Sequence, residues 1–156
     1  MTREIHNSWR EFHAATEQVL GRAQRELCIW DNDLAELRLD MPEHIDCLRR
    51  ILIGNADVRI ALKRTDHLHR DHPRLVELFK HYSHTFQILQ VHAGLENVRD
   101  TLVIADRAHV VIRPELAQPR STHILDDPVE TAPWLKRFEA VWAEGGIPFS
   151  PTTLGL

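Results

Sequence analysis

Short apolar runs alternate with amphipathic helix patterns along most of this 156-residue chain, and this alternation restricts its fold more than any other feature. The short runs have the composition or period-two pattern of buried strands, whereas the helix patterns repeat apolar residues every three or four positions. Strands that alternate with helices favour an α/β architecture, in which helices cover the faces of one sheet. We therefore expect an α/β domain with helices on both faces of its sheet.

The predicted order of elements is α-β-α-β-α-β-β-β-α. Helices are expected over 8–25, 40–54, 73–82 and 127–145, and strands over 27–30, 58–63, 86–91, 101–105 and 109–112. The early strands would be parallel because helices connect them, and the last two would form an antiparallel hairpin. We expect residues 1–146 to form a single domain and residues 147–156 to form an extended tail.

Three predicted helix starts carry capping boxes, in which one side chain accepts a bond from an early backbone amide and an acidic residue reaches back. They are Ser8-Trp9-Arg10-Glu11, Asp40-Met41-Pro42-Glu43 and Asp127-Pro128-Val129-Glu130. Between the hairpin and the last helix the sequence contains several prolines, and we expect a loop there.

The charge balance argues against nucleic acid as a partner. Lys and Arg number 19 against 23 Asp and Glu, a formal net charge of -4, whereas proteins that bind a phosphate backbone usually carry a basic surface.

Cys28 and Cys47 lie in apolar or amphipathic runs and are interpreted as small buried hydrophobic residues. With no leader pattern and no apolar run near ~18 residues, we expect a cytoplasmic protein without a membrane partner.

One histidine-rich segment has the spacing H-x-H-x-D-H, formed by His67, His69, Asp71 and His72. This segment resembles the zinc motif of the metallo-β-lactamase superfamily. The resemblance implies a zinc-dependent hydrolase, in which these four residues hold Zn²⁺ and the metal generates hydroxide from water.

The rest of the chain does not fit that superfamily. Members of that superfamily begin with strands, whereas this chain begins with a long predicted helix. They also need a further histidine and a bridging aspartate downstream; His123 and Asp126 or Asp127 could be nominated, but no motif marks them. A simpler interpretation is a solvated loop, with Asp71 or His72 near the start of the next helix.

Two acidic residues, Asp31 and Asp33, follow the predicted strand 27–30 directly. Open α/β sheets bind ligands outside the carboxyl ends of their strands, so these carboxylates are candidate ligand-binding groups. The alternative is a polar turn, in which they accept hydrogen bonds from backbone amides.

The predicted hairpin begins with the pattern D-x-L-V-I-A-D, which runs from Asp100 to Asp106. Together with the order of elements, the Pro73-Arg74-Leu75 helix start and the closing Phe138-x-x-x-Trp142 helix, this pattern resembles a phospholipase-D-like domain over about residues 8–145. It is similar to an uncharacterised bacterial domain whose relatives also follow GNAT acetyltransferase domains. The resemblance implies a mixed sheet, with parallel strands plus an antiparallel hairpin, flanked by helices on both faces.

Catalytic members of the phospholipase D superfamily carry H-x-K-x4-D on this strand. If Asp106 is the motif aspartate, Arg99 stands at the histidine and Thr101 at the lysine, and no H-x-K occurs anywhere in the chain. Without an imidazole there is no phosphohistidine route at this position. The resemblance therefore implies a catalytically silent binding or interaction module rather than an enzyme.

Arginine suits the geometry of phosphate and carboxylate groups, so Arg99 and Arg113 are candidate anion-binding residues. The alternative is that they pair with neighbouring aspartates on the surface. The full set of candidate ligand-binding residues is Arg99, Asp106, Arg113, Asp31 and Asp33. The resemblance further implies two partners, a second copy of the chain in a homodimer and an acetyltransferase. No cofactor is expected, except zinc on the hydrolase interpretation.

Overall fold

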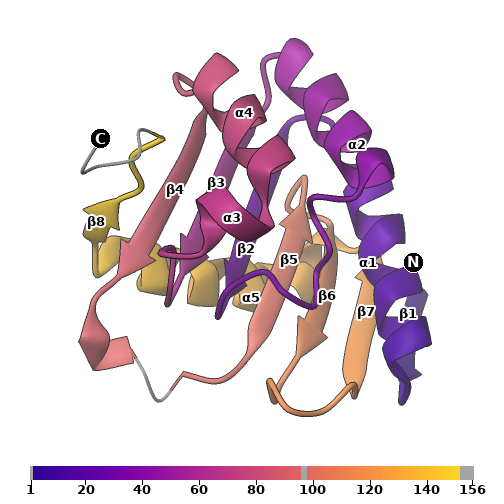
Figure 1. Ribbon diagram of the computed structural model, residues 1–156. Coiled ribbons are helices and arrows are strands. Elements are labelled where there is room, and N and C mark those ends of the chain that lie inside the picture. Colours follow the sequence, from indigo (N-terminus) through magenta and orange to yellow (C-terminus); the bar gives the residue numbers. More distant parts are fainter. Residues whose placement is uncertain (1, 96–97, 152–156) are drawn as a thin grey trace.

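A mixed eight-stranded sheet in the order β1-β7-β6-β5-β2-β3-β4-β8 runs through the computed structural model, which describes residues 2–95 and 98–151 (Figure 1). The strands are β1 (Thr2–His6), β2 (Glu26–Asp31), β3 (Asp57–Leu62), β4 (Phe86–Val91), β5 (Thr101–Ala105), β6 (His109–Arg113), β7 (Ser121–Leu125) and β8 (Gly146–Pro148). The helices are α1 (Trp9–Arg22), α2 (Pro42–Ile53), α3 (Leu68–Asp71), α4 (Pro73–His81) and α5 (Pro128–Ala143), with a 3-10 turn at Ala93–Leu95.

The sheet is parallel only in its middle. Strands β2, β3 and β4 run parallel, and every other neighbouring pair is antiparallel. Helices α1 to α4 lie on one face and α5 crosses the other (Figure 1). The expectation of a mixed α/β sheet with helices on both faces is confirmed.

The central strand β2 is buried on both faces, which explains its uninterrupted apolar sequence. Leu27 and Ile29 pack with the core beneath α1 to α4, whereas Cys28 and Trp30 pack with the core beneath α5. The same alternation places β5 between the two helical layers. Because strands buried on both faces have continuous apolar sequences, the middle strands of the sheet were the easiest to predict from the sequence.

The two strands at one edge of the sheet were not expected. The segment Ser121–Leu125, predicted as loop, forms β7, and Thr2–His6 forms β1 against it, with Glu4 opposite His123. Most side chains of β1 are exposed, so its sequence carries no apolar alternation. Backbone pairing and a few polar side-chain contacts hold this edge strand. The loop prediction for residues 121–125 was wrong for a different reason: β7 is largely buried, but two of its buried residues, Ser121 and His123, are polar and obscure the strand pattern.

The N-cap half of two of the three predicted capping boxes is confirmed, but not the reciprocal bond: Glu11 accepts from the amide of Asn7 at 3.3 Å, and the amide of Asp127 donates to the oxygen of Ala108. The Ser8 hydroxyl accepts a hydrogen bond from the Glu11 amide at 3.1 Å, and the Asp127 carboxylate accepts one from Glu130 at 3.1 Å. The prediction for Asp40 was wrong: its carboxylate accepts from the amide of Leu75 at 2.9 Å, in the first turn of α4. Asp40 therefore caps a helix that lies far along the chain.

The last segments extend the sheet beyond the expected domain boundary. Strand β8 pairs antiparallel with β4, so residues 147 and 148 of the predicted tail continue the sheet, and the amide of Phe149 donates to the oxygen of Ile88. Residues 152–156 of that tail lie outside the described residues. Cys28 is buried as expected, but Cys47 is only half-buried. Across the described residues, no helix combines the length and apolarity that a membrane crossing requires.

Replacing Asp40 tests the long-range cap. We expect Asp40→Ala to lower the free energy of unfolding by about 1 kcal/mol, because the first turn of α4 loses its side-chain acceptor. Urea unfolding measures the effect. Asp46→Ala is the matched control, since exposed Asp46 bonds only to Arg49 one turn away. An equal loss in both variants would contradict the role given to Asp40.

Candidate functional site

Two candidate residues that lie 82 positions apart in the sequence, Asp31 and Arg113, meet inside the protein. Asp31 ends β2 and Arg113 ends β6, and Thr101 at the start of β5 lies between them. The Thr101 hydroxyl donates to the Asp31 carboxylate at 2.5 Å, and the Arg113 guanidinium donates to the Thr101 oxygen at 3.2 Å. These three side chains form a buried polar cluster at one end of the central strands.

Aromatic rings and backbone oxygens of the described residues surround the guanidinium of Arg113. It lies 5.1 Å from the ring centre of Trp9 and 5.0 Å from that of Phe12, both on α1. It also donates to the backbone oxygens of Glu115 and Leu116. With only 2% of its surface exposed, Arg113 holds α1 and the loop after β6 against the sheet and is not open to a ligand.

Burial changes the protonation preferences of this cluster. It raises the pKa of Asp31, and the hydroxyl of Thr101 and the charge of Arg113 only partly oppose that effect. Burial also lowers the pKa of Arg113. Because the folded-state pKa of Asp31 is raised, its contribution to stability is largest below its ordinary pKa of about 4 and falls as pH rises.

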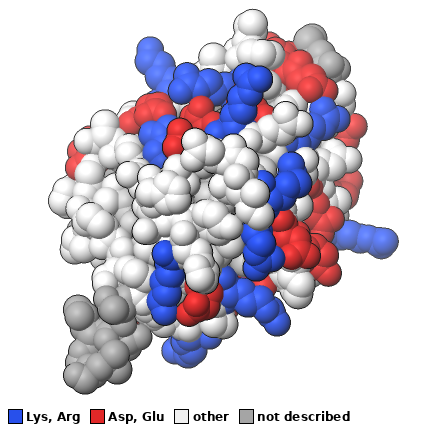
Figure 2. All heavy atoms as spheres, turned by 90° about the horizontal axis from the view of Figure 1, so that it is seen from above, with Lys and Arg blue, Asp and Glu red and all other residues white. Residues whose placement is uncertain are grey.

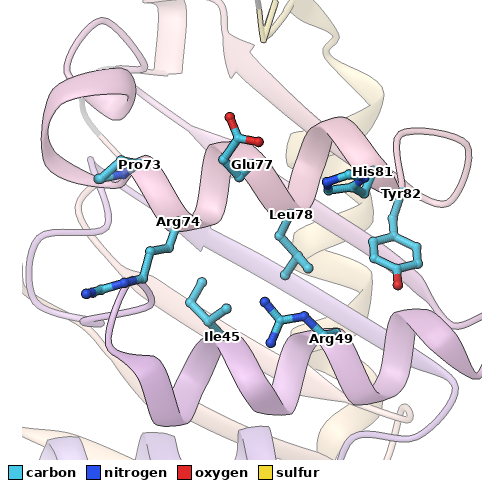
Figure 3. A pocket seen from close by; sticks show the side chains of 8 residues that line it. All are labelled: Ile45, Arg49, Pro73, Arg74, Glu77, Leu78, His81 and Tyr82. Atoms are coloured by element: carbon cyan, nitrogen blue, oxygen red, sulfur yellow. The ribbon is translucent and has the colours of Figure 1, made fainter.

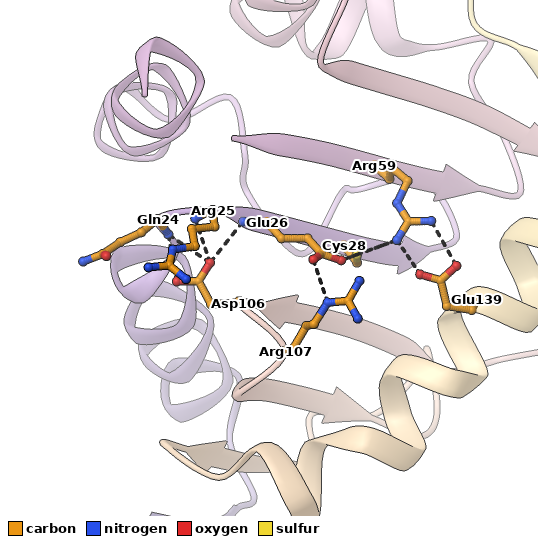
Figure 4. A network of polar contacts seen from close by, with 8 residues as sticks. All are labelled: Gln24, Arg25, Glu26, Cys28, Arg59, Asp106, Arg107 and Glu139. Carbon is orange, nitrogen blue, oxygen red and sulfur yellow. Dashed lines mark hydrogen bonds and ion pairs between the residues drawn. The ribbon is translucent and has the colours of Figure 1, made fainter. Parts of the chain in front are cut away.

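The two other candidates of the hairpin lie apart from this cluster. Arg99 is exposed and pairs with Glu115 at 3.0 Å on the surface. Asp106 lies in the turn between β5 and β6, where its carboxylate accepts hydrogen bonds from the backbone amides of Gln24, Arg25 and Glu26 (Figure 4). Asp106 therefore fastens the hairpin to the start of β2.

A second polar network joins β3 to α5 on the opposite face (Figure 4). The guanidinium of Arg59 forms a bidentate pair with Glu139 and lies 5.1 Å from the ring centre of Phe138. It also lies 3.5 Å from the sulfur of Cys28. Burial raises the pKa of Cys28 to about 12, so this thiol stays protonated and does not act as a nucleophile near neutral pH.

The remaining early candidate, Asp33, lines a solvent-accessible hollow of about 590 Å³, which we call the arginine hollow. It lies beyond the carboxyl ends of β2 and β3, where the loops that follow them meet the start of α4. Its charged and imidazole-bearing lining residues are Asp33, Arg38, Asp40, Arg64, His67, Arg70, Asp71, His72 and Arg74. Two motifs selected separately from sequence thus line one site.

The arginines of this hollow differ in how far they are already paired. Arg70 forms a bidentate pair with its neighbour Asp71, and Arg74 donates to the backbone oxygen of Asp40. Arg38 is exposed, and within the described residues no side chain or backbone oxygen accepts a hydrogen bond from its guanidinium. This leaves at least one guanidinium available to an anion.

The loop that carries Arg38 has an uncommon backbone. Leu34 and Arg38 both adopt positive φ angles, of 70° and 53°, although neither is glycine. The Asp31 carboxylate accepts from the Leu34 amide at 2.8 Å, and the His67 ring donates to the backbone oxygen of Asp33 at 2.7 Å. The buried cluster and the histidine-rich segment therefore hold a strained loop that lines the hollow.

The predicted zinc ligands do not form a metal site with one another. The Nε2 of His67 is occupied by the oxygen of Asp33, the ring of His69 packs 5.3 Å from that of Phe149, and Asp71 pairs with Arg70. In the described residues, the only group of three or more ligand atoms close enough to share an ion is elsewhere. The structure does not support the zinc hydrolase interpretation, nor the nomination of Asp126 or Asp127: Asp126 pairs with Arg22 and Asp127 caps α5.

Another hollow, of about 690 Å³, runs between α2 and α4 and shares Arg74 with the arginine hollow. Figure 3 shows Ile45 of α2 and Leu78 of α4 pointing into the space between the two helices, with Arg49 beside them. It is mainly apolar, so it complements the arginine hollow rather than repeating its chemistry. Sequence analysis missed Arg38, Arg64, Arg70 and Arg74. An available signal was that Arg38 and Arg64 lie in the loops that follow two neighbouring strands predicted to be parallel.

The surface seen from above in Figure 2 carries charged side chains of both signs. Seen from above, Lys and Arg are interspersed with Asp and Glu, beside a broad area that carries no formal charge (Figure 2). Among the described residues of this view there is no continuous basic field of the kind that binds a phosphate backbone.

The fold is that of a phospholipase-D-like domain. The phospholipase D family member Nuc from Salmonella typhimurium superposes with a TM-score of 0.64 at 12% identity, covering 95% of this chain and 97% of that one. NucT from Helicobacter pylori gives 0.65 at 10% identity, covering 95% and 99%. These identities establish a shared fold alone.

A third solved structure with this fold is TrmBL2, described as an archaeal chromatin protein with a novel mode of DNA binding. It gives a TM-score of 0.68 at 16% identity, covering 94% of this chain, which spans only 54% of TrmBL2. No curated protein matches the chain in sequence. Residues 8–148 match the family described as a domain of unknown function, DUF7931, and the chain belongs to that family.

The buried cluster makes a testable prediction about Arg113. We expect Arg113→Met to lower the free energy of unfolding by about 3 kcal/mol or more, because it leaves the buried Asp31 carboxyl without its cation. The double variant Asp31→Asn/Arg113→Met should be more stable than Arg113→Met, since it removes the unpaired acid as well. Chemical denaturation of both variants measures the coupling, and strictly additive losses would contradict it.

Proposed function

We propose that this chain is a phospholipase-D-like domain without phosphodiesterase activity, which works as a binding module. The proposal rests on one observation: the residues at the catalytic motif positions make contacts that stabilise the fold. By the resemblance, Arg99 stands at the catalytic histidine and Thr101 at the lysine; Arg99 pairs with Glu115 on the surface, and Thr101 is buried against Asp31. Neither residue supplies a nucleophile at this place.

The surrounding packing supports the same conclusion. In an active site of this class, the space beyond the motif strand must admit a phosphodiester. Here the guanidinium of Arg113 and the rings of Trp9 and Phe12 occupy that side of Thr101. A substrate would have to displace a buried charge from two aromatic faces, which is costly.

Within this proposal, the ligand carries an anionic group that binds in the arginine hollow. Within the described residues the guanidinium of Arg38 has no hydrogen bond or ion pair, and Arg64 pairs with Asp66 only at 3.7 Å, with both side chains exposed. Guanidinium groups bind phosphate and carboxylate through paired hydrogen bonds. The mainly apolar hollow between α2 and α4 adjoins this site at Arg74 and would accept a neighbouring apolar group.

Two partners are proposed on the resemblance alone. One is a second copy of the chain, meeting at an edge of the sheet or at the β5–β6 hairpin. The other is an acetyltransferase that this domain would recruit. The cytoplasm is the location proposed with them.

The absence of phosphodiesterase activity is directly measurable. We expect purified protein to release no nitrophenol from bis(p-nitrophenyl) phosphate above the buffer rate, because the motif positions hold Arg99 and Thr101. Turnover that persists through purification and falls in an Arg99→Gln or Thr101→Val variant would overturn the proposal. Turnover unchanged in both variants would identify a contaminating enzyme.

The anion site has its own test, with inorganic phosphate and pyrophosphate as probes. Calorimetric titration should detect binding that weakens about tenfold in Arg38→Gln, the effect of losing one charge-assisted hydrogen bond. Arg99→Gln is the matched control, because Arg99 is exposed but lies outside the hollow. Equal weakening in the two variants, or no binding by the unmodified protein, would count against the arginine hollow.

A further inference from the structure

The edge strand β1 and its neighbour β7 bring three metal-ligating side chains together, at the side of the sheet away from β2 and β3, whose loops line the arginine hollow. Glu4 on β1 lies directly opposite His123 on β7, and His6 follows Glu4 by two residues, so all three share one face of the sheet. One ligand atom from each lies within 4.8 Å of the other two. Sequence analysis had nominated His123 only for a different site, together with the histidine-rich segment.

His123 gives a second and independent reason to expect a ligand here. It is only 2% exposed, yet neither of its ring nitrogens has a hydrogen-bond partner in the described part of the chain. The Nε2 of His6 also has none. Buried polar atoms without partners cost free energy, so each one in a folded protein calls for a group that satisfies it.

The surroundings of His6 match those of a metal-bound histidine. Its Nε2 lies 3.8 Å from the Glu4 carboxylate, and its Nδ1 lies 3.6 Å from the Glu11 carboxylate on the other side of the ring. Glu11 is itself held by the Ser8 hydroxyl at 2.9 Å. Metal-binding imidazoles almost always give their second nitrogen to such a carboxylate, which orients the ring.

We propose that Glu4, His6 and His123 bind one divalent transition-metal ion with the ligand preference of Zn²⁺. Two imidazoles and one carboxylate favour such an ion over Mg²⁺ or Ca²⁺, which prefer oxygen ligands alone. Donor atoms around tetrahedral zinc are about 3.3 Å apart, by the usual bond lengths, so modest side-chain rotation closes the site. The Glu4 side chain is 56% exposed, which leaves one coordination position facing solvent.

The ion would fasten an edge strand that otherwise depends on backbone pairing and on polar contacts such as the exposed Arg3–Glu130 pair. Most side chains of β1 are exposed, and the strand contributes no residue to the buried apolar core. Metal binding links β1 to β7 and, through His6 and Glu11, to the first turn of α1. Because the ion binds only the folded arrangement, it stabilises the folded state by mass action.

Competition between the tag-free protein and a chromophoric chelator for Zn²⁺ tests the site. We expect one equivalent to bind, and His6→Gln and Glu4→Gln to weaken binding at least tenfold. His69→Gln is the matched control, because His69 packs against Phe149 and not near this cluster. No competition by the unmodified protein, or weakening in His69→Gln but not in Glu4→Gln, would overturn the proposal.

A second measurement distinguishes loss of metal binding from loss of folded structure in the variants. His123 is buried and its replacement can disturb β7, whereas exposed Glu4 can change to Gln with little effect on the fold. Zn²⁺ should raise the melting temperature of the unmodified protein and of His69→Gln, but not that of Glu4→Gln. Co²⁺ in place of Zn²⁺ should give visible d–d absorption that Glu4→Gln lacks. Equal stabilisation of Glu4→Gln would overturn the assignment, whatever the anion and phosphodiesterase assays find.

Discussion

The rest of the structure depends on how the β5–β6 hairpin is fastened to β2. At one end, the Asp106 carboxylate accepts hydrogen bonds from three successive backbone amides before and at the start of β2. At the other end, Thr101 and Arg113 meet Asp31 in a buried cluster. These contacts set the register of the antiparallel half of the sheet against the parallel half, and each helical layer packs on the result.

This fastening also determines which polar side chains of the central strands are open to solvent. Strand β5 carries Thr101, whose hydroxyl is buried and donates to Asp31. Arg113 fills the adjoining space and stacks on α1. Displacing a buried charge with this many partners is costly, because each partner would be left unsatisfied. The accessible charged groups of the arginine hollow lie instead in the loops after β2 and β3 and at the start of α4.

Sequence reasoning succeeded where side-chain pattern and burial coincide. The double burial of β2 and the amphipathic stripes of the helices predicted the α/β class, and the capping residues Ser8 and Asp127 marked two helix starts. It failed at β1, whose side chains are mostly exposed, and at β7, where buried polar residues interrupt the apolar pattern. It also failed at Asp40, whose carboxylate accepts from an amide of α4. Local sequence cannot indicate which remote amide a carboxylate will reach.

By itself, the sequence determined the layers of this protein and the absence of an H-x-K motif, because periodicity and residue identity are local properties. Only the tertiary structure decided what each candidate does. It buried Asp31 and Arg113 together, gave Asp106 to the backbone of β2, joined Asp33 and His67 in one hollow, and brought His123 beside β1. These outcomes depend on contacts between distant segments, since burial and geometry set the chemistry of a polar side chain.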